Sequence, residues 1–93
     1  MRLVIRAGAV RNLDRILIWI AKDNPRAAIA LIQRIEARLE RLAMAGLANR
    51  ARRGRISGTR ELVEPPYVIV YRIDEGRDEL HVLSILHGAR RRL

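Results

Sequence analysis

Two aliphatic runs near the end of the chain constrain its fold more than any other feature. Residues Tyr67–Ile73 and Leu80–Leu86 are dense in β-branched and aliphatic side chains, and a short polar loop containing Gly76 separates them. This pattern predicts a β-hairpin, in which Gly76 supplies the positive φ that such a loop needs. Because the first run is apolar on both faces except at Arg72, we expect it to be a central strand of a sheet.

Two amphipathic helices are predicted ahead of this hairpin. Over about Ala9–Lys22 the apolar residues recur with helical periodicity, with Ile18 outside the apolar arc and Trp19 at its edge. The periodicity is clearest over about Pro25–Ala45, and Asn24 can cap that helix with proline at its first position. The link between the helices is short, so we expect an antiparallel helical hairpin.

Two further strands complete the predicted elements. Alternation over Arg2–Ala7 indicates a short strand that Gly8 ends, and Ile56–Glu64 indicates a strand just before the hairpin. The order is β-α-α-β-β-β, an α+β fold in which the helical hairpin packs on a small, mostly antiparallel sheet. Ninety-three residues suit a single domain, 1–93.

The charge of the chain points to an anionic partner. Nineteen basic residues face ten acidic ones, for a net charge of +9, and every basic residue except Lys22 is arginine. A codon preference for arginine accounts equally well for the choice of Arg over Lys, but not for the surplus of positive charge. Such a surplus on a small protein favours an acidic or polyanionic partner.

Several classes of protein are excluded by what the chain lacks. There is no cysteine and there are only two histidines, without the spacing of a zinc site, so we expect no disulfide, no metal and no cofactor. No apolar run approaches the roughly 20 residues of a membrane-spanning helix. We therefore expect a cytoplasmic protein that does not contact a membrane.

Three sequence blocks, together with the junction of the two helices, resemble a known family. Gly58–Leu62, Pro66–Arg72 and Leu86–Arg90 follow the Trp19–Pro25 junction in a specific order and spacing. By these blocks, over nearly its whole length, the chain resembles the ParE/RelE superfamily of toxins from type II toxin–antitoxin systems. The resemblance implies the same fold, and a growth-inhibiting toxin silenced by a cognate antitoxin. That antitoxin would be ParD-like or RelB-like, in a heterotetramer or larger complex.

The resemblance leaves two kinds of target open for the toxin. RelE-like members resemble ribosome-dependent ribonucleases, which cut mRNA without metal and need an acid, a base and cations. ParE-like members are associated with poisoning of DNA gyrase and need no catalytic set. The position that carries arginine in RelE-type nucleases is Val68 here, which favours the ParE branch. We expect a non-enzymatic toxin acting on DNA gyrase, with an mRNA endonuclease acting at the ribosome as the alternative.

The candidate catalytic and target-binding residues lie on the predicted strands or just after the last of them. If the chain is a nuclease, a histidine, which titrates near neutral pH, can serve as its acid or base. The resemblance then implies a working set of His87, Arg90, Arg60 and Tyr71. The candidate target-binding residues are Arg60, Arg72, His87 and Arg90.

Each of these candidates also has a purely structural explanation. His87 can hydrogen-bond the terminal loop, and Tyr71 can pack in the core. The two arginines of the sheet, Arg60 and Arg72, can form ordinary surface ion pairs with Glu61, Glu64 or Asp74. The other histidine, His81, is expected to be a strand residue without a role.

Candidate antitoxin-binding residues lie on the helices and on the basic connector over 47–55. Ile18 and Trp19 are expected to be exposed docking points. Three arginines share one arc of the second helix with no glutamate three or four residues away, so that helix does not neutralise them. The full set is Ile18, Trp19, Arg34, Arg38, Arg41, Arg50 and Arg53. A third hypothesis, a simple nucleic-acid-binding module, uses the same arginines.

Overall fold

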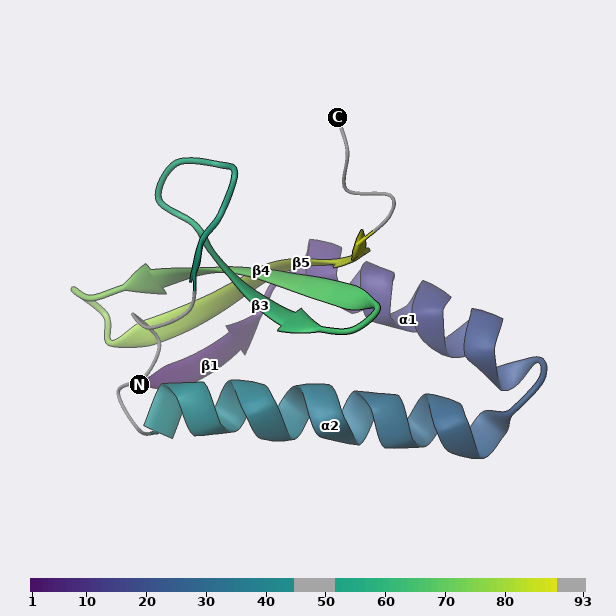
Figure 1. Cartoon of the computed structure of the whole chain (residues 1–93). Helices are drawn as coiled ribbons and strands as arrows, with labels where there is room; N and C mark the ends of the chain where they lie inside the picture. The colour runs from purple at the N-terminus through teal and green to yellow at the C-terminus, as the bar shows by residue number, and fades with distance from the viewer. Residues whose placement is uncertain (45–51, 89–93) are drawn as a thin grey trace.

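The computed structural model describes residues 1–44 and 52–88 and contains two helices and five strands (Figure 1). The predicted order β-α-α-β-β-β is confirmed, with one additional short strand after the helices. The elements are β1 (Arg2–Ile5), α1 (Ala7–Ala21), α2 (Pro25–Met44), β2 (Arg52–Arg53), β3 (Arg60–Glu64), β4 (Tyr67–Asp74) and β5 (Glu79–His87). Neither helix has the length and apolar composition needed to cross a membrane, within the part of the chain that is described.

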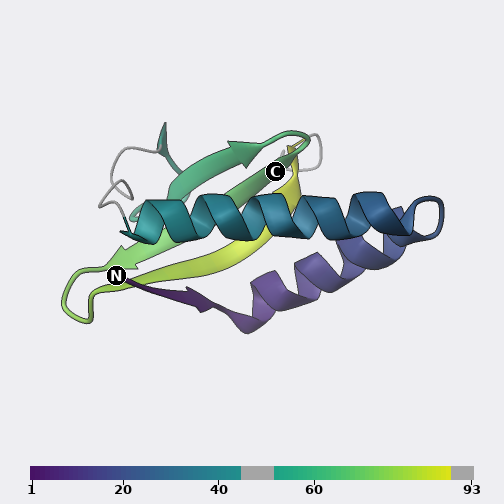
Figure 2. The same ribbon diagram turned by 90° about the horizontal axis from the view of Figure 1, so that it is seen from below.

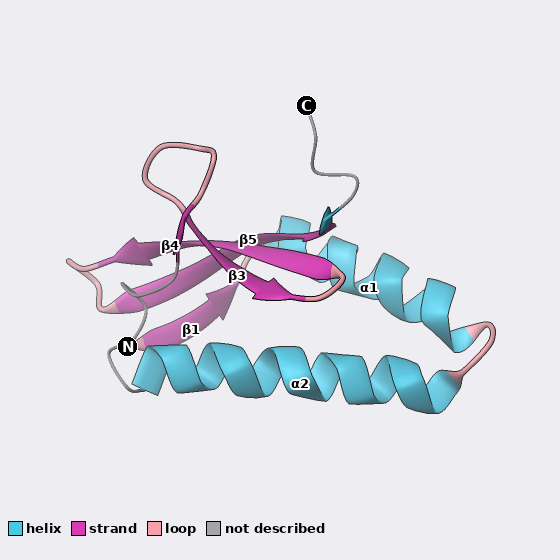
Figure 3. Ribbon diagram, viewed as in Figure 1, coloured by secondary structure: helices cyan, strands magenta, loops and turns pink. Residues whose placement is uncertain are grey.

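The strands form one mixed sheet in the order β1-β5-β4-β3-β2. β1 runs parallel to β5, whereas the other neighbouring strands are antiparallel. The strand predicted to be central, β4, lies in the middle of this order. α2 lies in front of the sheet in the view from below, and α1 lies beside α2, packed on β5 (Figures 2 and 3). The fold therefore has two layers, with one face of the sheet left uncovered by helices.

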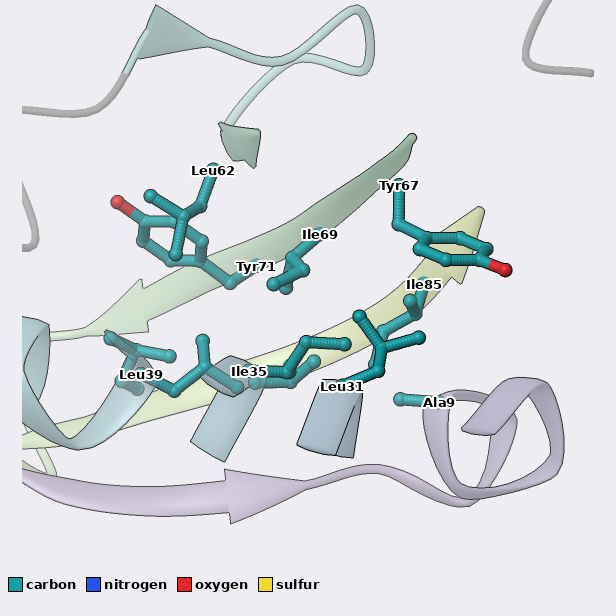
Figure 4. Close-up of a cluster of buried hydrophobic side chains, with 11 residues drawn as sticks. Ala9, Leu31, Ile35, Leu39, Leu62, Tyr67, Ile69, Tyr71 and Ile85 are labelled. Atoms are coloured by element: carbon teal, nitrogen blue, oxygen red, sulfur yellow. The ribbon is translucent and has the colours of Figure 1, made fainter. Parts of the chain in front are cut away.

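The register of β4 and β5 decides which side chains face the helices. Residues paired directly across two strands project to the same face of a sheet. Ile69 pairs with Ile85 and Tyr71 pairs with Val82, and all four are buried in the core cluster. They pack against three residues of α2, which are Leu31, Ile35 and Leu39 (Figure 4). Each of these aliphatic side chains contributes about 1.5–3 kcal/mol by leaving water.

The two helices begin for different local reasons. Asn24 caps α2 as predicted, since its side-chain oxygen accepts a hydrogen bond from the backbone N–H of Ala27 at 3.1 Å. α1, in contrast, begins at Ala7, so Gly8 lies in its first turn and does not separate it from the strand. A Cβ atom at Gly8 would lie 3.3 Å from the carbonyl oxygen of Leu83. The glycine thus allows α1 to approach β5 closely.

Three predictions about loops and strands were wrong in detail. In the β4–β5 loop the positive φ belongs to Asp78 (53°) and not to Gly76, because an aspartate tolerates the left-handed region. The strand expected over Ile56–Glu64 begins only at Arg60, after a turn in which Gly58 has a φ of 81°. Part of the expected connector, Arg52–Arg53, is a strand, so the sheet has five strands where four were expected.

Candidate functional site

The four residues of the hypothetical nuclease set do not come together among the described residues. Arg60 is opposite Tyr71, in the middle of β4, whereas His87 is opposite Tyr67 at the start of β4. Tyr67 and Tyr71 are four residues apart on the strand, so roughly 13 Å separates the two positions. The fourth candidate, Arg90, lies outside the described residues.

Tyr71 lies in the hydrophobic core, as its structural explanation requires. Its side chain is completely buried in the core cluster beneath the helices. Burial raises the pKa of its phenol, and the nearby charge of Arg60 opposes that rise only in part. A group on a target molecule outside the protein does not reach this ring in the present structure, so the packing explanation fits Tyr71 better than a catalytic role.

The side chains of His87 and Arg72 lie on opposite faces of the sheet. The His87 ring lies on the helix side, edge-on to Tyr67, with ring centroids 5.7 Å apart and an interplanar angle of 80°. Arg72 is exposed and is opposite His81 on the face without helices. The candidate target-binding residues therefore do not form one continuous patch, in the part of the chain that is described.

A charged network on the uncovered face was not predicted. Glu79 is buried, and it accepts hydrogen bonds from Arg2 and from Nε2 of His81, the latter at 3.0 Å. The other ring nitrogen of His81 lies 3.4 Å from Arg6. The hydrogen bond with His81, followed by that with Arg2, lowers the pKa of the Glu79 carboxyl despite its burial. His81, expected to have no role, thus helps to join β1 to β5.

One group of residues in this network has the spacing of metal ligands. Ligand atoms of Asp74, Glu79 and His81 all lie within 4.8 Å of one another. Both oxygens of Glu79 are already hydrogen-bonded, and Arg2 and Arg6 add positive charge nearby. These two features oppose the binding of a cation, so we assign no metal to this group.

The arginine stripe of α2 is partly neutralised, although not within its own helix. Glu64, at the end of β3, forms ion pairs with Arg34 Nε at 3.2 Å and with Arg38 Nη1 at 2.6 Å. The hydrogen bond with Arg38, assisted by that with Arg34, lowers the pKa of the Glu64 carboxyl below its usual value. The stripe therefore also fastens α2 to the sheet. Arg41, the third arginine, lines a small cleft beside Leu42 and Leu62.

The remaining antitoxin-binding candidates are exposed or not described. Ile18 and Trp19 are 64% and 69% exposed, as expected from the helical pattern. Arg53 is exposed on β2, where it lies opposite Arg60, and Arg50 lies outside the described residues. The exposure of these residues makes contact with a partner feasible, but it does not identify the partner.

A groove of about 440 Å³ lies between α1 and the ends of β4 and β5. The side-chain oxygen of Asn12 accepts a hydrogen bond from the backbone N–H of Ile85 at 3.0 Å and so holds the helix against the strand. The residues that line the groove are Asn12, Arg15, Ile16, Trp19, Tyr67, Ile85, Leu86 and His87. Only Trp19 and His87 were candidates from the sequence, because the groove depends on how α1 packs on the sheet.

A helical hairpin on one face of a small mixed sheet, with a strong excess of arginine, defines a small basic α+β protein suited to contacts with other macromolecules. The chain matches the family model of the ParE toxin of the type II toxin–antitoxin system parDE over residues 3–92. It therefore belongs to the ParE family of type II toxin–antitoxin toxins.

Two curated relatives agree with this family. The chain is 40% identical to a candidate toxin, Y4kP, of Sinorhizobium fredii over 86% of this chain and 80% of the relative. It is 35% identical to toxin RelE1 of Caulobacter vibrioides over 96% of this chain and 95% of that toxin. One relative carries a RelE-type name, whereas the family model is that of ParE, so the comparisons do not separate the two branches.

Solved structures agree with the fold. The chain is similar to a chain of the chromosomal ParDE toxin–antitoxin system from P. aeruginosa, with a TM-score of 0.76 and 26% identity. That alignment covers 94% of this chain and 95% of the other. A chain of the RelBE2 toxin–antitoxin complex from Mycobacterium tuberculosis shares the fold, with a TM-score of 0.60, 22% identity, and coverage of 92% and 95%.

Proposed function

We propose that this protein inhibits bacterial growth by binding DNA gyrase and that it has no catalytic set of its own. The observation that carries the proposal is the separation of the nuclease candidates, since Tyr71 is buried and His87 lies opposite Tyr67, four residues away along β4. Val68, on the central strand, brings an aliphatic side chain where RelE-type nucleases carry an arginine. Membership of the ParE family supports the same target.

The same proposal includes a cognate antitoxin that neutralises the toxin in the cytoplasm. The solved relative from P. aeruginosa belongs to a toxin–antitoxin system, and the net charge of +9 suits an acidic partner. We infer a ParD-like antitoxin and a heterotetramer or larger complex. The proposed contacts, which are at least partly exposed, are Ile18, Trp19, Arg34, Arg38, Arg41 and Arg53. Arg50 remains a prediction of the sequence alone.

The proposed contacts with the target are Arg72 on the uncovered face and His87 at the end of β5. Both side chains are exposed and belong to the central part of the sheet. Arg60 is also proposed, although it is half-buried, and Arg90 remains a prediction of the sequence alone.

A RelE-like endonuclease is the second candidate. The similarity to toxin RelE1 favours it, because that relative spans 96% of this chain. In this case His87 and Arg60 would need a partner such as the ribosome to complete the active site, since the residues opposite them, Tyr67 and Tyr71, are four residues apart on β4.

The order of events after induction tests the proposal. The chain is expressed from a tightly regulated promoter in bacterial cells, and plasmid supercoiling and mRNA integrity are followed together. We expect loss of negative supercoiling before any change in mRNA. Cleavage of ribosome-bound mRNA with supercoiling intact would instead support the endonuclease and overturn the gyrase proposal.

A further inference from the structure

The loop between β2 and β3 projects from the body of the protein. Figure 1 shows this loop, residues 54–59, on the side of the sheet away from α2. The backbone N–H of Gly54 donates a hydrogen bond to the carbonyl oxygen of Thr59 at 2.8 Å and closes the base of the loop. A Cβ atom at Gly54 would lie 2.1 Å from Oγ1 of Thr59, so this narrow closure requires a glycine. Residues 55–58, between the two, form the apex.

The apex is held in one conformation by its own hydrogen bonds. The carbonyl oxygen of Ile56 accepts hydrogen bonds from the backbone N–H of Thr59 at 3.1 Å and from its hydroxyl at 2.6 Å. Gly58 has a φ of 81°, which suits the third position of a type II turn. The backbone N–H of Arg55 donates to the buried carboxylate of Glu61 at 3.3 Å. A partner that binds this apex therefore has little conformational entropy to remove from it.

The apex combines an aliphatic side chain with positive charge. Ile56 is 70% exposed, and Arg53 and Arg55 are exposed beside it in the chain. From Arg52 to Arg60 the sequence has four arginines and no acidic residue. The arginines attract phosphate groups, but phosphates do not cover an aliphatic side chain. A nucleic acid supplies both kinds of surface, since its apolar bases are stacked between two phosphate backbones.

We propose that this loop binds duplex DNA through the minor groove, with Ile56 as a wedge between neighbouring base pairs. Isoleucine is one of the side chains that proteins insert between base steps from the minor groove, beside basic residues that contact the backbone. The minor groove is only about 6 Å wide, and the residues after Ile56, Ser57 and Gly58, are small. Arg53 and Arg55 then pair with phosphates. The inference rests on the proposed function, because gyrase is an enzyme that acts on DNA.

Insertion of Ile56 has a consequence for the way in which the protein inhibits gyrase. A wedge between base pairs partly unstacks them and kinks the duplex by about 20–90°. A toxin bound to gyrase then distorts the DNA on which the enzyme acts. Inhibition follows from this distortion in addition to the contact with the enzyme.

Unstacking of a base step can be measured without gyrase. The probe is a DNA duplex of about two helical turns, with a central TA step, which unstacks easily. A fluorescent adenine analogue in that step becomes brighter when its neighbours unstack. The duplex is titrated with the purified protein at several salt concentrations. We expect saturable binding that weakens as salt rises, together with an increase in fluorescence.

Two variants of the loop separate the wedge from the phosphate contacts. Ile56→Ala should abolish the increase in fluorescence while the salt dependence stays, because the arginines are unchanged. Arg55→Gln should lower the slope of log affinity against log salt by about one.

Two variants on α2, on the other side of the sheet, are the matched controls. Ile29→Ala removes an aliphatic side chain that is 57% exposed, and Arg26→Gln removes an exposed positive charge. Neither should change the fluorescence or the slope. Circular dichroism checks that all four variants are folded.

Four results would overturn the inference: no binding, binding without an increase in fluorescence, equal effects of Ile56→Ala and Ile29→Ala, or tighter binding of single-stranded RNA of the same sequence. None of these readouts depends on gyrase or on growth. Unstacking by a protein that leaves gyrase unaffected would refute the proposed function while the DNA contact stands. Inhibition of gyrase without unstacking would refute only the DNA contact.

Discussion

The His87 ring stands edge-on to the Tyr67 ring, 5.7 Å from it, at the end of the sheet where the groove opens. A pair of rings in this geometry contributes about 0.5–1.5 kcal/mol beyond the area that it buries. This contact gives His87 a structural role in addition to the proposed contact with the target.

Substitutions of His87 separate a ring contact from acid–base chemistry. His87→Ala should lower the free energy of unfolding by about 1 kcal/mol, measured by urea denaturation. His87→Phe keeps an aromatic ring and should recover most of that loss. His87→Phe also removes both ring nitrogens, so an endonuclease that uses His87 as acid or base should lose cleavage of ribosome-bound mRNA in this stable variant. Cleavage that persists in His87→Phe would exclude acid–base catalysis by His87.

Removal of the Glu64 charge should loosen α2 from the sheet. Glu64→Gln weakens the ion pairs with Arg34 and Arg38, and because both arginines are partly exposed we expect a loss of up to about 1 kcal/mol at neutral pH. Glu36→Gln, on the exposed side of α2, is the matched control and should change little.

The stability difference between wild type and Glu64→Gln should depend on pH. The pKa of Glu64 is lowered in the folded protein from a value of 4.5. Its charge therefore stabilises the fold fully above pH 4.5, and this contribution is lost as the pH falls through the lower, folded-state pKa. Urea midpoints across this range measure the effect. A difference that stays constant down to strongly acid pH would contradict the assigned ion pairs.

Truncation of a core side chain of α2 should lower the free energy of unfolding strongly. Ile35 is 1% exposed and packs in the core, so Ile35→Ala should destabilise the protein by about 2–5 kcal/mol. Ile29 is on the same helix but 57% exposed, and Ile29→Ala should change the free energy of unfolding by less than about 0.5 kcal/mol. Similar costs for the two variants would mean that α2 is rotated relative to its position in this structure.

The loop between β4 and β5 provides a test of backbone conformation. Asp78 has a φ of 53°, so Asp78→Val should destabilise the hairpin by about 1 kcal/mol or more. Gly76 does not have a positive φ, and a Cβ there would meet only Asp74 at an ordinary distance of 3.6 Å. Gly76→Ala should therefore be neutral or slightly stabilising. Thermal unfolding of the two variants distinguishes the observed loop from the one that the sequence predicted.

The sequence predicted those parts of the fold that local patterns determine. Helix α2, its Asn24 cap and the central position of β4 follow from periodicity and from the distribution of apolar residues. The parallel pairing of β1 with β5 and the Glu64 ion pairs join residues far apart in the sequence, and a local pattern carries no signal for them. For the same reason the sequence missed the roles of Asn12 and Arg15 in the groove.

The candidate site was predictable only in part. Exposure of Ile18 and Trp19 followed from their place on the helical arc. The nuclease set followed from the resemblance, and the strand register separates its members because Arg60 pairs with Tyr71 and His87 pairs with Tyr67, four residues apart on β4. Which residues converge is decided by register, and register depends on the packing of the whole sheet.

The most direct test of the central claim is the supercoiling of relaxed plasmid DNA by purified gyrase in the presence of this protein. The account predicts inhibition that rises with the amount of protein, weakens in Arg72→Ala and is retained in the loop control Arg77→Ala. Undiminished supercoiling at the highest protein concentration, together with cutting of mRNA on translating ribosomes, would contradict it.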